Sequence, residues 1–295
     1  MTTRRDFLVK VGGAALGVTA LACAKGRADG TRVDTTPAAA KSTGDHRLER
    51  IGIQLYTLRT LLAKDFEGTL ARVAEIGYKE VELAGFFGRT PVQLRELLAK
   101  HGLTSPSSHI AMPDTDAAWT RTLEDANTIG NKWVVMPWID ATQRKSPDDW
   151  PRIAERYNVL AAKAKAAGLR FAYHNHDFEL VKVGDSTGLE VLLSKTDPAL
   201  VDFEMDIYWI VKGGGDPFDF IARHPKRFPL MHVKDATAAP ERKMMDVGSG
   251  TIDFAKIFAA GAASGMKHAF VEHDNPADPS ASARASYTHL AALRW

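Results

Sequence analysis

From Arg50 onward, the chain alternates short apolar runs with longer segments whose apolar residues recur at helical spacing. Five helical segments end in a glycine, and an apolar run follows within a few residues, at Gly77, Gly102, Gly130, Gly168 and Gly265. A glycine just after a helix can adopt the left-handed conformation that satisfies the last helical carbonyls, and the chain can then turn into a strand. The pattern therefore predicts repeated helix–strand units.

The apolar runs predict eight strands, near residues 50–56, 80–83, 104–109, 133–136, 170–175, 201–206, 228–233 and 269–272. Helices are expected between the strands and after the last one. Eight alternating units over residues 48–295 are typical of a single-domain (β/α)8 TIM barrel, an α/β fold. An open doubly wound sheet is the alternative, but no glycine-rich fingerprint follows the first strand.

The first 47 residues do not continue this pattern. "TTRRDFLVK" precedes an apolar run from Val11 to Ala22, and paired arginines before a short apolar stretch are typical of a twin-arginine export signal. Residues 1–23 are interpreted as this signal, and residues 24–47 as a disordered linker. Two processing routes stay open, namely cleavage after Ala22 or lipidation of Cys23 as the first residue of a lipoprotein.

Export by the twin-arginine translocase would place the protein in the periplasm, or anchored to a membrane outside the cytoplasm. Cys23 is the only cysteine, so no disulfide can form within the chain. Residues 1–23 carry three basic side chains and one acidic one, a net +2, which subtracted from the formal +2 of the chain leaves about zero. A chain with a net charge near zero has no excess of basic residues with which to bind nucleic acid. Nucleic acid is therefore not expected as a partner.

Polar side chains stand at the carboxyl ends of most predicted strands, where the chemistry of a TIM barrel is located. They are Gln54 and Tyr56, Glu82, His109, His174 with His176, Asp206, His232 and Glu272. An unpaired buried polar group costs about 1–3 kcal/mol, so a purely structural core would not collect them in this way.

Four of these residues are expected to converge on one divalent metal ion, namely His174, Asp206, His232 and Glu272. They are separated by 32, 26 and 40 residues, close to one strand–helix unit each. Imidazole and carboxylate ligands suit Mn²⁺, Co²⁺, Zn²⁺, Fe²⁺ or Mg²⁺. By itself His232 is more typical of a hydrogen-bonded core histidine, whereas buried carboxylates are rare unless they are paired or metal-bound.

Four further residues are assigned to substrate binding, and each has a simpler alternative. In the simpler alternative, Glu82 is a solvated residue at the mouth of its strand, and His109 is a polar strand end without a role in binding. Trp209 is otherwise a wall of the cavity, although its aromatic face suits a sugar ring. Asp235 is otherwise the ion-pair partner of Lys234.

Seven motifs occur in the order seen in xylose-isomerase-like TIM-barrel proteins: "GIQLYTLR", "YKEVELAG", "YHNHDFE", "DIYW", "HVKD", "VGSGTIDF" and "FVEHD". This group includes sugar phosphate isomerase/epimerases and inosose dehydratases. The resemblance covers residues 48–292, and its motifs are specific to the superfamily but not to one reaction.

The resemblance implies one divalent metal ion, with Mn²⁺ preferred, held by residues from the last four strands. Asp206, His232 and Glu272 match three of the ligands. The epimerases usually carry a glutamate as the ligand from strand five, where this chain has His174, and Glu179 is the alternative ligand. They also carry a histidine three residues after the aspartate of strand six, where this chain has Trp209.

For catalysis, the resemblance implies that a proton next to a carbonyl of a sugar or keto-sugar is removed. Epimerases of this group use two metal-bound glutamates, and here only Glu272 matches. His176 or Glu179 would handle the second proton, and Lys234 would stabilise the developing oxyanion. The expected activity is that of an isomerase or epimerase, with an inosose dehydratase-like or 3-keto-sugar lyase or hydratase reaction as the alternative.

Two other classes of protein compete with this interpretation. A DNA-repair endonuclease shares the superfamily, but it needs a basic groove that the neutral chain does not offer. A non-catalytic carbohydrate-binding lipoprotein would keep the barrel without the chemistry. A small, unphosphorylated sugar or keto-sugar is the expected partner. The sequence leaves open whether the protein forms a homo-oligomer.

Overall fold

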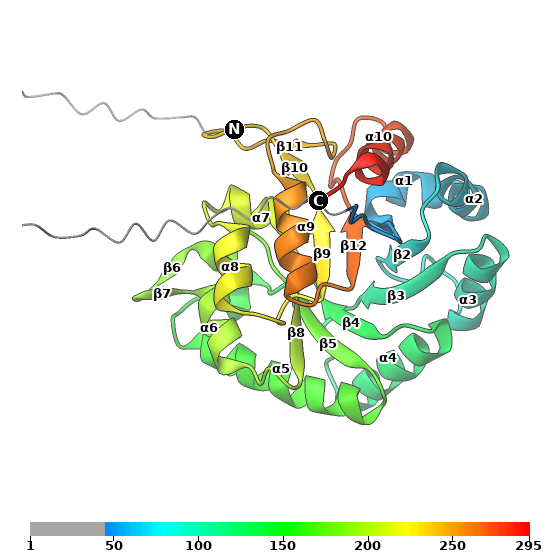
Figure 1. Ribbon diagram of the computed structural model, residues 1–295. Coiled ribbons are helices and arrows are strands. Elements are labelled where there is room, and N and C mark those ends of the chain that lie inside the picture. The colour runs from blue at the N-terminus through cyan, green and yellow to red at the C-terminus, as the bar shows by residue number, and fades with distance from the viewer. Residues whose placement is uncertain (1–44) are drawn as a thin grey trace, which may run out of the picture. The chain divides into compact units, whose positions relative to one another are not determined.

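The computed structural model describes residues 45–295, which form a closed eight-stranded barrel surrounded by helices (Figure 1). All eight neighbouring strand pairs in the barrel are parallel. The predicted single-domain TIM barrel is therefore confirmed. The predicted signal at residues 1–23, and the predicted linker up to residue 44, lie outside the described residues.

The barrel strands follow one another around the barrel in chain order, and the last pairs with the first. They are β1 (Gly52–Gln54), β2 (Glu80–Leu83), β3 (Thr104–His109), β4 (Trp133–Met136), β5 (Arg170–His174), β8 (Val201–Asp206), β9 (Leu230–Val233) and β12 (His268–Val271). Two short hairpins lie outside the barrel: β6 (Lys182–Val183) with β7 (Ser186–Thr187), and β10 (Asp235–Ala236) with β11 (Met244–Met245).

Helices connect the strands and form the outer layer seen in Figure 1. They are α1 (Arg59–Leu62), α2 (Phe66–Ile76), α3 (Pro91–Lys100), α4 (Asp116–Ile129), α5 (Asp149–Ala166), α6 (Gly188–Lys195), α7 (Ile207–Lys212), α8 (Pro217–Arg223), α9 (Phe254–Ala263) and α10 (Pro279–Ala292). Within residues 45–295, no helix has the length and apolar character needed to cross a membrane.

The predicted strands overlap all eight barrel strands, and the differences lie at their ends. The first strand stops at Gln54 instead of residue 56. The Gln54 side chain accepts a hydrogen bond from the Tyr56 amide (3.0 Å), and a 3₁₀ turn begins at the next residue. The last strand ends at Val271, so Glu272 stands just beyond it. The five glycines that follow helices all have positive φ, between 67° and 123°, as predicted.

Alternation along each strand divides the apolar residues into two layers. The outward-facing set packs beneath the helices and makes up most of the core. The inward-facing set forms a separate apolar layer inside the barrel, consisting of Trp133, Val135, Ala172, Leu230 and Phe270. Because successive strand residues point to opposite faces, the next inward position toward the carboxyl end lies above this layer. That position is where the polar residues of the strands collect.

Gly52 allows Phe270 to fill the inner apolar layer. A Cβ atom on Gly52 would lie 2.4 Å from Phe270 Cδ1, closer than van der Waals contact allows. Gly52→Ala is therefore expected to lower the free energy of unfolding by about 1–3 kcal/mol, which urea denaturation would measure.

Gly261 on α9 provides the matched control. A Cβ there would meet the flexible end of Met231 at 2.7 Å, and alanine favours a helix over glycine by roughly 1 kcal/mol. Gly261→Ala is expected to be neutral or stabilising. Equal losses for the two variants would contradict tight packing at Gly52 as the cause.

Candidate metal centre

A pocket of about 570 Å³ opens at the carboxyl ends of the barrel strands. Its lining includes apolar or aromatic residues such as Tyr56, Ile110 and Trp138. The polar residues of the lining are His109, His174, His176, Lys234, Glu272 and Asp274. Five of the residues predicted for the site therefore line one cavity, and Asp274 joins them.

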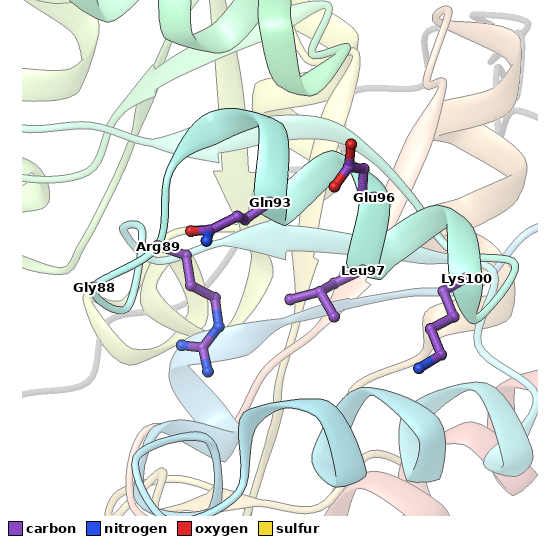
Figure 2. A pocket seen from close by; sticks show the side chains of 6 residues that line it. All are labelled: Gly88, Arg89, Gln93, Glu96, Leu97 and Lys100. Atoms are coloured by element: carbon purple, nitrogen blue, oxygen red, sulfur yellow. The ribbon is translucent and has the colours of Figure 1, made fainter.

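A second hollow, of about 520 Å³, lies against α3 (Figure 2). It is lined by Gly88, Arg89, Gln93, Glu96, Leu97 and Lys100. With a single carboxylate and no imidazole in its wall, it offers no set of metal ligands. The pocket above the barrel is therefore the candidate site.

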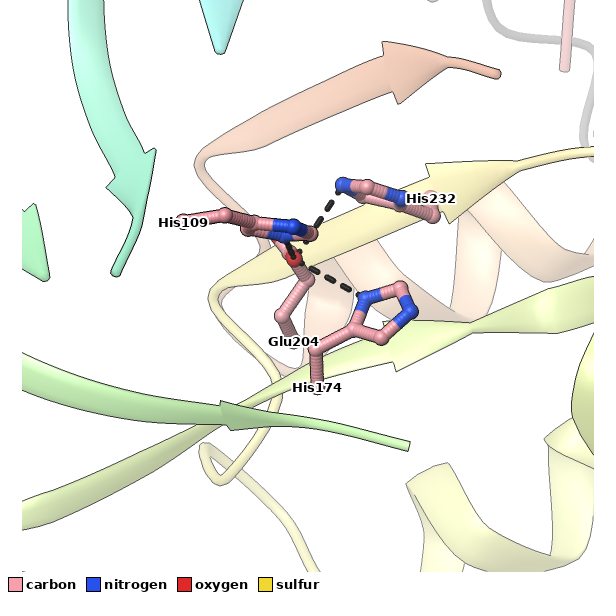
Figure 3. A group of neighbouring side chains, drawn as sticks. All are labelled: His109, His174, Glu204 and His232. Carbon is pink, nitrogen blue, oxygen red and sulfur yellow. Dashed lines mark hydrogen bonds and ion pairs between the residues drawn. The ribbon is translucent and has the colours of Figure 1, made fainter. Parts of the chain in front are cut away.

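Four neighbouring side chains form what we call the deep group, namely His109, His174, Glu204 and His232 (Figure 3), and the first two of them also line the pocket. They come from β3, β5, β8 and β9. Glu204 Oε2 lies at the centre, 2.8 Å from His109 Nε2, 3.0 Å from His174 Nδ1 and 3.1 Å from His232 Nε2. Glu204 is fully buried.

Glu204 was not among the residues predicted from the sequence. It precedes Asp206 by two positions in "FEMD", and side chains two apart on a strand share one face. The alternation was therefore the signal that could have identified it. The predicted residues lie at or just beyond the strand ends, whereas Glu204 lies two positions before the end of β8 (Val201–Asp206).

Glu82 adjoins the deep group. Its Oε2 atom lies 2.6 Å from His232 Nε2 and 3.1 Å from His109 Nε2, and it accepts a hydrogen bond from Gln54 Nε2 at 2.8 Å. The residue is fully buried, so the alternative of a solvated Glu82 at the strand mouth is wrong. Glu82 lies beneath the pocket rather than in its lining.

A second set of donors, the outer group, consists of Asp206, His232 and Glu272. His232 Nδ1 lies 2.8 Å from Glu272 Oε2, so this histidine faces the outer group with one ring nitrogen and the deep group with the other. His174 Nε2 lies 3.6 Å from Asp206 Oδ2. The four predicted metal ligands are thus brought together, with His174 at the edge of the outer group.

Lys234 provides a positive charge to the outer group. Its Nζ atom lies 2.6 Å from Glu272 Oε2, 3.0 Å from Asp206 Oδ2 and 2.7 Å from Asp274 Oδ1. The alternative in which Lys234 pairs with Asp235 is therefore wrong.

These contacts set the protonation of the outer group. Burial raises the pKa of Asp206 to about 6, and the Lys234 ammonium limits the rise. Burial would also raise the pKa of Glu272, but Lys234 and His232 outweigh it and hold that pKa below its usual range. The carboxylates overcome the effect of burial on Lys234 and raise its pKa. At neutral pH, Glu272 is ionised and Lys234 is charged.

The deep group is arranged around negative charge as well. Burial tends to lower the pKa of His109, but Glu82 and Glu204 outweigh burial and raise it to about 9. Burial and the neighbouring imidazoles lower the pKa of His174. Glu82 and Glu204 therefore favour the protonated, positively charged form of His109.

The donor set fits a divalent cation. Imidazole nitrogens and carboxylate oxygens are the ligands of Zn²⁺, Mn²⁺ and related ions. Glu82 Oε1 and Glu204 Oε1 are buried oxygens with no hydrogen-bond partner within the described residues, and Asp206 Oδ2 has only its ion-pair contacts with Lys234 and His174. Such buried, unsatisfied acceptors are rare unless a ligand or ion completes them.

Glu179, predicted as an alternative ligand or proton carrier, lies in neither donor group. Its fully buried carboxylate accepts hydrogen bonds from the Tyr173 hydroxyl and, at 2.9 Å, from the His176 amide. It thereby positions the loop that carries His176 into the pocket. Burial lowers the pKa of His176 to about 3, so this imidazole is neutral at physiological pH.

Asp235 and Trp209 lie behind the pocket lining. The carboxylate of Asp235 accepts hydrogen bonds from loop amides, including those of Gly248 and Gly250, both at 2.9 Å. It therefore holds the "VGSGTIDF" loop in place. The ring of Trp209 lies 5.5 Å from that of His176 and 5.7 Å from Lys234 Nζ. A substrate contact for either residue stays a prediction.

Glu179 is expected to make stability depend on pH. Burial raises its pKa from 4.5 to about 7, so the folded protein holds an extra proton between these values. The free energy of unfolding should then fall as pH rises through this window, by an amount on the order of a few kcal/mol. Thermal melts at pH 5, 6, 7 and 8 would measure this slope.

Glu179→Gln should flatten that slope, because the amide does not titrate. Glu155→Gln, at an exposed position on α5, should keep the wild-type slope and serves as the matched control. An unchanged slope in Glu179→Gln would show that another group is responsible.

Comparison with known proteins places this geometry in a family. The model of the xylose isomerase-like TIM barrel matches residues 70–293. An inosose dehydratase of Lacticaseibacillus casei is 24% identical over 233 residues, 66% of this chain and 77% of the relative. An inosose dehydratase of Clostridium perfringens is 23% identical over 232 residues, 65% of this chain and 76% of the relative.

Among solved structures, a sugar phosphate isomerase/epimerase from Parabacteroides distasonis superposes with a TM-score of 0.73 at 25% identity. The superposition covers 87% of this chain and 98% of that protein. The family model, the related sequences and the shared barrel agree with one another. The chain therefore belongs to the xylose isomerase-like TIM barrel family.

Proposed function

We propose that the protein is a divalent-metal-dependent enzyme that removes a proton next to the carbonyl of a sugar or keto-sugar, as an isomerase or epimerase does. One observation carries this proposal. Glu272, an ionised carboxylate, and Lys234, a charged ammonium, stand 2.6 Å apart in the wall of one pocket, among buried donors that could hold a metal ion. A base and an oxyanion-stabilising cation are the two groups that enolisation requires.

In this reaction Glu272 takes the proton from the carbon next to the carbonyl. As negative charge develops on the carbonyl oxygen, Lys234 exchanges one of its carboxylate contacts for a hydrogen bond to that oxygen. The neutral imidazole of His176, held in the wall by Glu179, exchanges the second proton. Each role uses the protonation state that the residue has at neutral pH.

A bound divalent ion would supply Lewis-acid polarisation of the carbonyl. His174 and His232 would help to hold it, because each faces both donor groups, and carboxylates from one of the groups would complete the ligand set. Mn²⁺, Co²⁺, Zn²⁺, Fe²⁺ and Mg²⁺ all suit such mixed ligands.

Loss of water from the same enolate is the alternative reaction, as in an inosose dehydratase or a 3-keto-sugar lyase. Two observations favour it. The curated relatives are inosose dehydratases, and Glu272 is the only glutamate of the outer group, so a second glutamate base is missing from that group. A product lighter than the substrate by one water would identify elimination.

An unphosphorylated substrate suits the pocket. Lys234 is the only lysine in its lining, which contains no arginine, and three carboxylates already engage its ammonium. A phosphate group would therefore find no free cation there. Export by the twin-arginine route, with cleavage after Ala22 or lipidation of Cys23, completes the proposal and would place the enzyme outside the cytoplasm.

The proposal predicts that the metal-loaded protein exchanges a substrate C–H proton with solvent. Ketohexoses, inososes and 3-keto-glucosides in D₂O form the test panel, and NMR follows the loss of the proton signal. Glu272→Gln is expected to slow exchange by about 10²–10⁴-fold, because the amide cannot accept the proton.

Glu96→Gln, at an exposed position in the hollow of Figure 2, is the matched control and should exchange at the wild-type rate. Tight sugar binding with no exchange for any compound of the panel would favour a non-catalytic carbohydrate-binding protein and overturn the proposal.

A further inference from the structure

The lining of the pocket divides into two chemical halves, according to the strands that carry it. The apolar half consists of residues that follow the first four strands, namely Tyr56, Ala84, Gly85, Ile110, Ala111, Pro137 and Trp138. The polar residues belong to β5 and later strands, except His109 at the end of β3. Because the strands follow one another around the barrel in chain order, the two sets occupy different parts of the pocket.

We infer that the substrate is a glycoside with two rings. The reacting sugar binds among the polar residues, and a second ring with an apolar face, joined to the sugar by a glycosidic bond, binds in the apolar half. An aryl group and a second sugar both have such a face. This inference rests on the proposed function, because it names the class of sugar on which the same site acts.

The two aromatic residues of the apolar half are exposed. Tyr56 is 43% exposed and Trp138 is 49% exposed. The other large hydrophobic side chains exposed within residues 45–295 are three valines outside this pocket, namely Val92, Val159 and Val181. Single exposed apolar residues are normal on a protein surface, but aromatic side chains in one cavity are typical of a ligand site.

Neighbouring side chains hold both aromatic rings in place. The centroid of the Trp138 ring lies 4.9 Å from that of His176 and 4.8 Å from that of Phe178, at interplanar angles of 81° and 74°. The Arg59 guanidinium lies 4.0 Å from the centroid of the Tyr56 ring, and Arg59 donates a hydrogen bond to the Tyr56 carbonyl at 2.9 Å. A ligand that packs on rings already held in position loses less entropy on binding.

The apolar half has room for a ring. Tyr56 follows β1 and Trp138 follows β4, so these residues flank the half, and small residues such as Ala84, Gly85 and Ala111 come between them in strand order. A Cβ atom on Gly85 would meet no other atom within 4 Å. The whole pocket measures about 570 Å³, and pockets of roughly 300–1,000 Å³ enclose most of a drug-sized molecule.

A monosaccharide by itself would leave this half uncovered. Its hydroxyl groups need hydrogen-bond partners, which the carboxylates, the imidazoles and Lys234 provide. The side chains of the apolar half offer only the Tyr56 hydroxyl and the Trp138 indole N–H. The face of an aryl ring, or the C–H face of a pyranose, gains by leaving water and needs no such partner.

Matched glycosides test the inference without turnover. The probes are the methyl and phenyl β-glucosides and β-galactosides, with methyl β-cellobioside and methyl β-lactoside as two-sugar probes. None of them has a carbonyl, so no proton next to one can be removed, and calorimetric titration of the metal-loaded protein measures binding alone. A phenyl glycoside or a methyl disaccharide is expected to bind at least about tenfold tighter than the matching methyl glycoside.

Four variants assign this preference to the apolar half. Tyr56→Ala and Trp138→Ala should each reduce it to about threefold or less, whereas Trp138→Phe keeps an aromatic face and should retain most of it. Val159→Ala is the matched control, because Val159 is 53% exposed on α5 and outside the pocket. It should bind every probe as the wild type does. Near-ultraviolet circular dichroism shows whether each variant is folded, and Tyr56→Ala tests the inference if Trp138→Ala is not.

The occupant of the apolar half follows from the probe that is preferred. Tighter binding of the phenyl compounds identifies an aryl group, tighter binding of the disaccharides identifies a second sugar, and both results support the inference. Binding of neither kind more tightly than the methyl glycosides, including no binding at all, would overturn it. So would a preference that survives in both alanine variants, or a dimer that Trp138→Ala converts to a monomer on gel filtration, since a second copy would then cover the ring.

The two proposals fail in different ways. A protein that exchanges the protons of ketohexoses or inososes, but shows no preference among the glycosides, overturns this inference and leaves the proposed function standing. A clear preference among the glycosides, with no proton exchange for any compound of the panel, overturns the proposed reaction and leaves the two-ring site.

Discussion

The cost of burying charge controls the carboxyl end of this barrel. Glu82, Glu204 and Asp206 have no exposed surface, and Glu272 has little. Water cannot solvate these carboxylates, so each must find hydrogen bonds and positive charge within the protein. Imidazoles supply both to the deeper acids, and Lys234 supplies them to the outer ones. The perturbed pKa values of the site follow from this shortage of solvent and from these partners.

The closed barrel is what makes such a concentration of charge sustainable. Its strands alternate inward and outward positions, so one ring of side chains from different strands meets at each level. The apolar layer around Phe270 lies below the acids, and the helices cover the outside. Within this frame the acids, the histidines and Lys234 stand at or next to the ends of neighbouring strands.

The same arrangement connects structure to chemistry. A substrate in the pocket would meet Glu272 as an ionised carboxylate, Lys234 as an ammonium and His176 as a neutral imidazole. These states differ from one another because burial and the partner groups differ at each position, although the three residues share one wall. Membership of the xylose isomerase-like TIM barrel family accounts for the barrel.

The sequence by itself determined the barrel, its eight strands and the convergence of strand-end residues. Local periodicity and glycine caps encode these features, and closure of the barrel then follows. Only the tertiary structure decided which side chains pair. Lys234 contacts Asp206 rather than its neighbour Asp235, and Glu204 enters the site although it does not end its strand. Such pairing depends on the stagger between strands that are distant in the chain, and no local pattern records it.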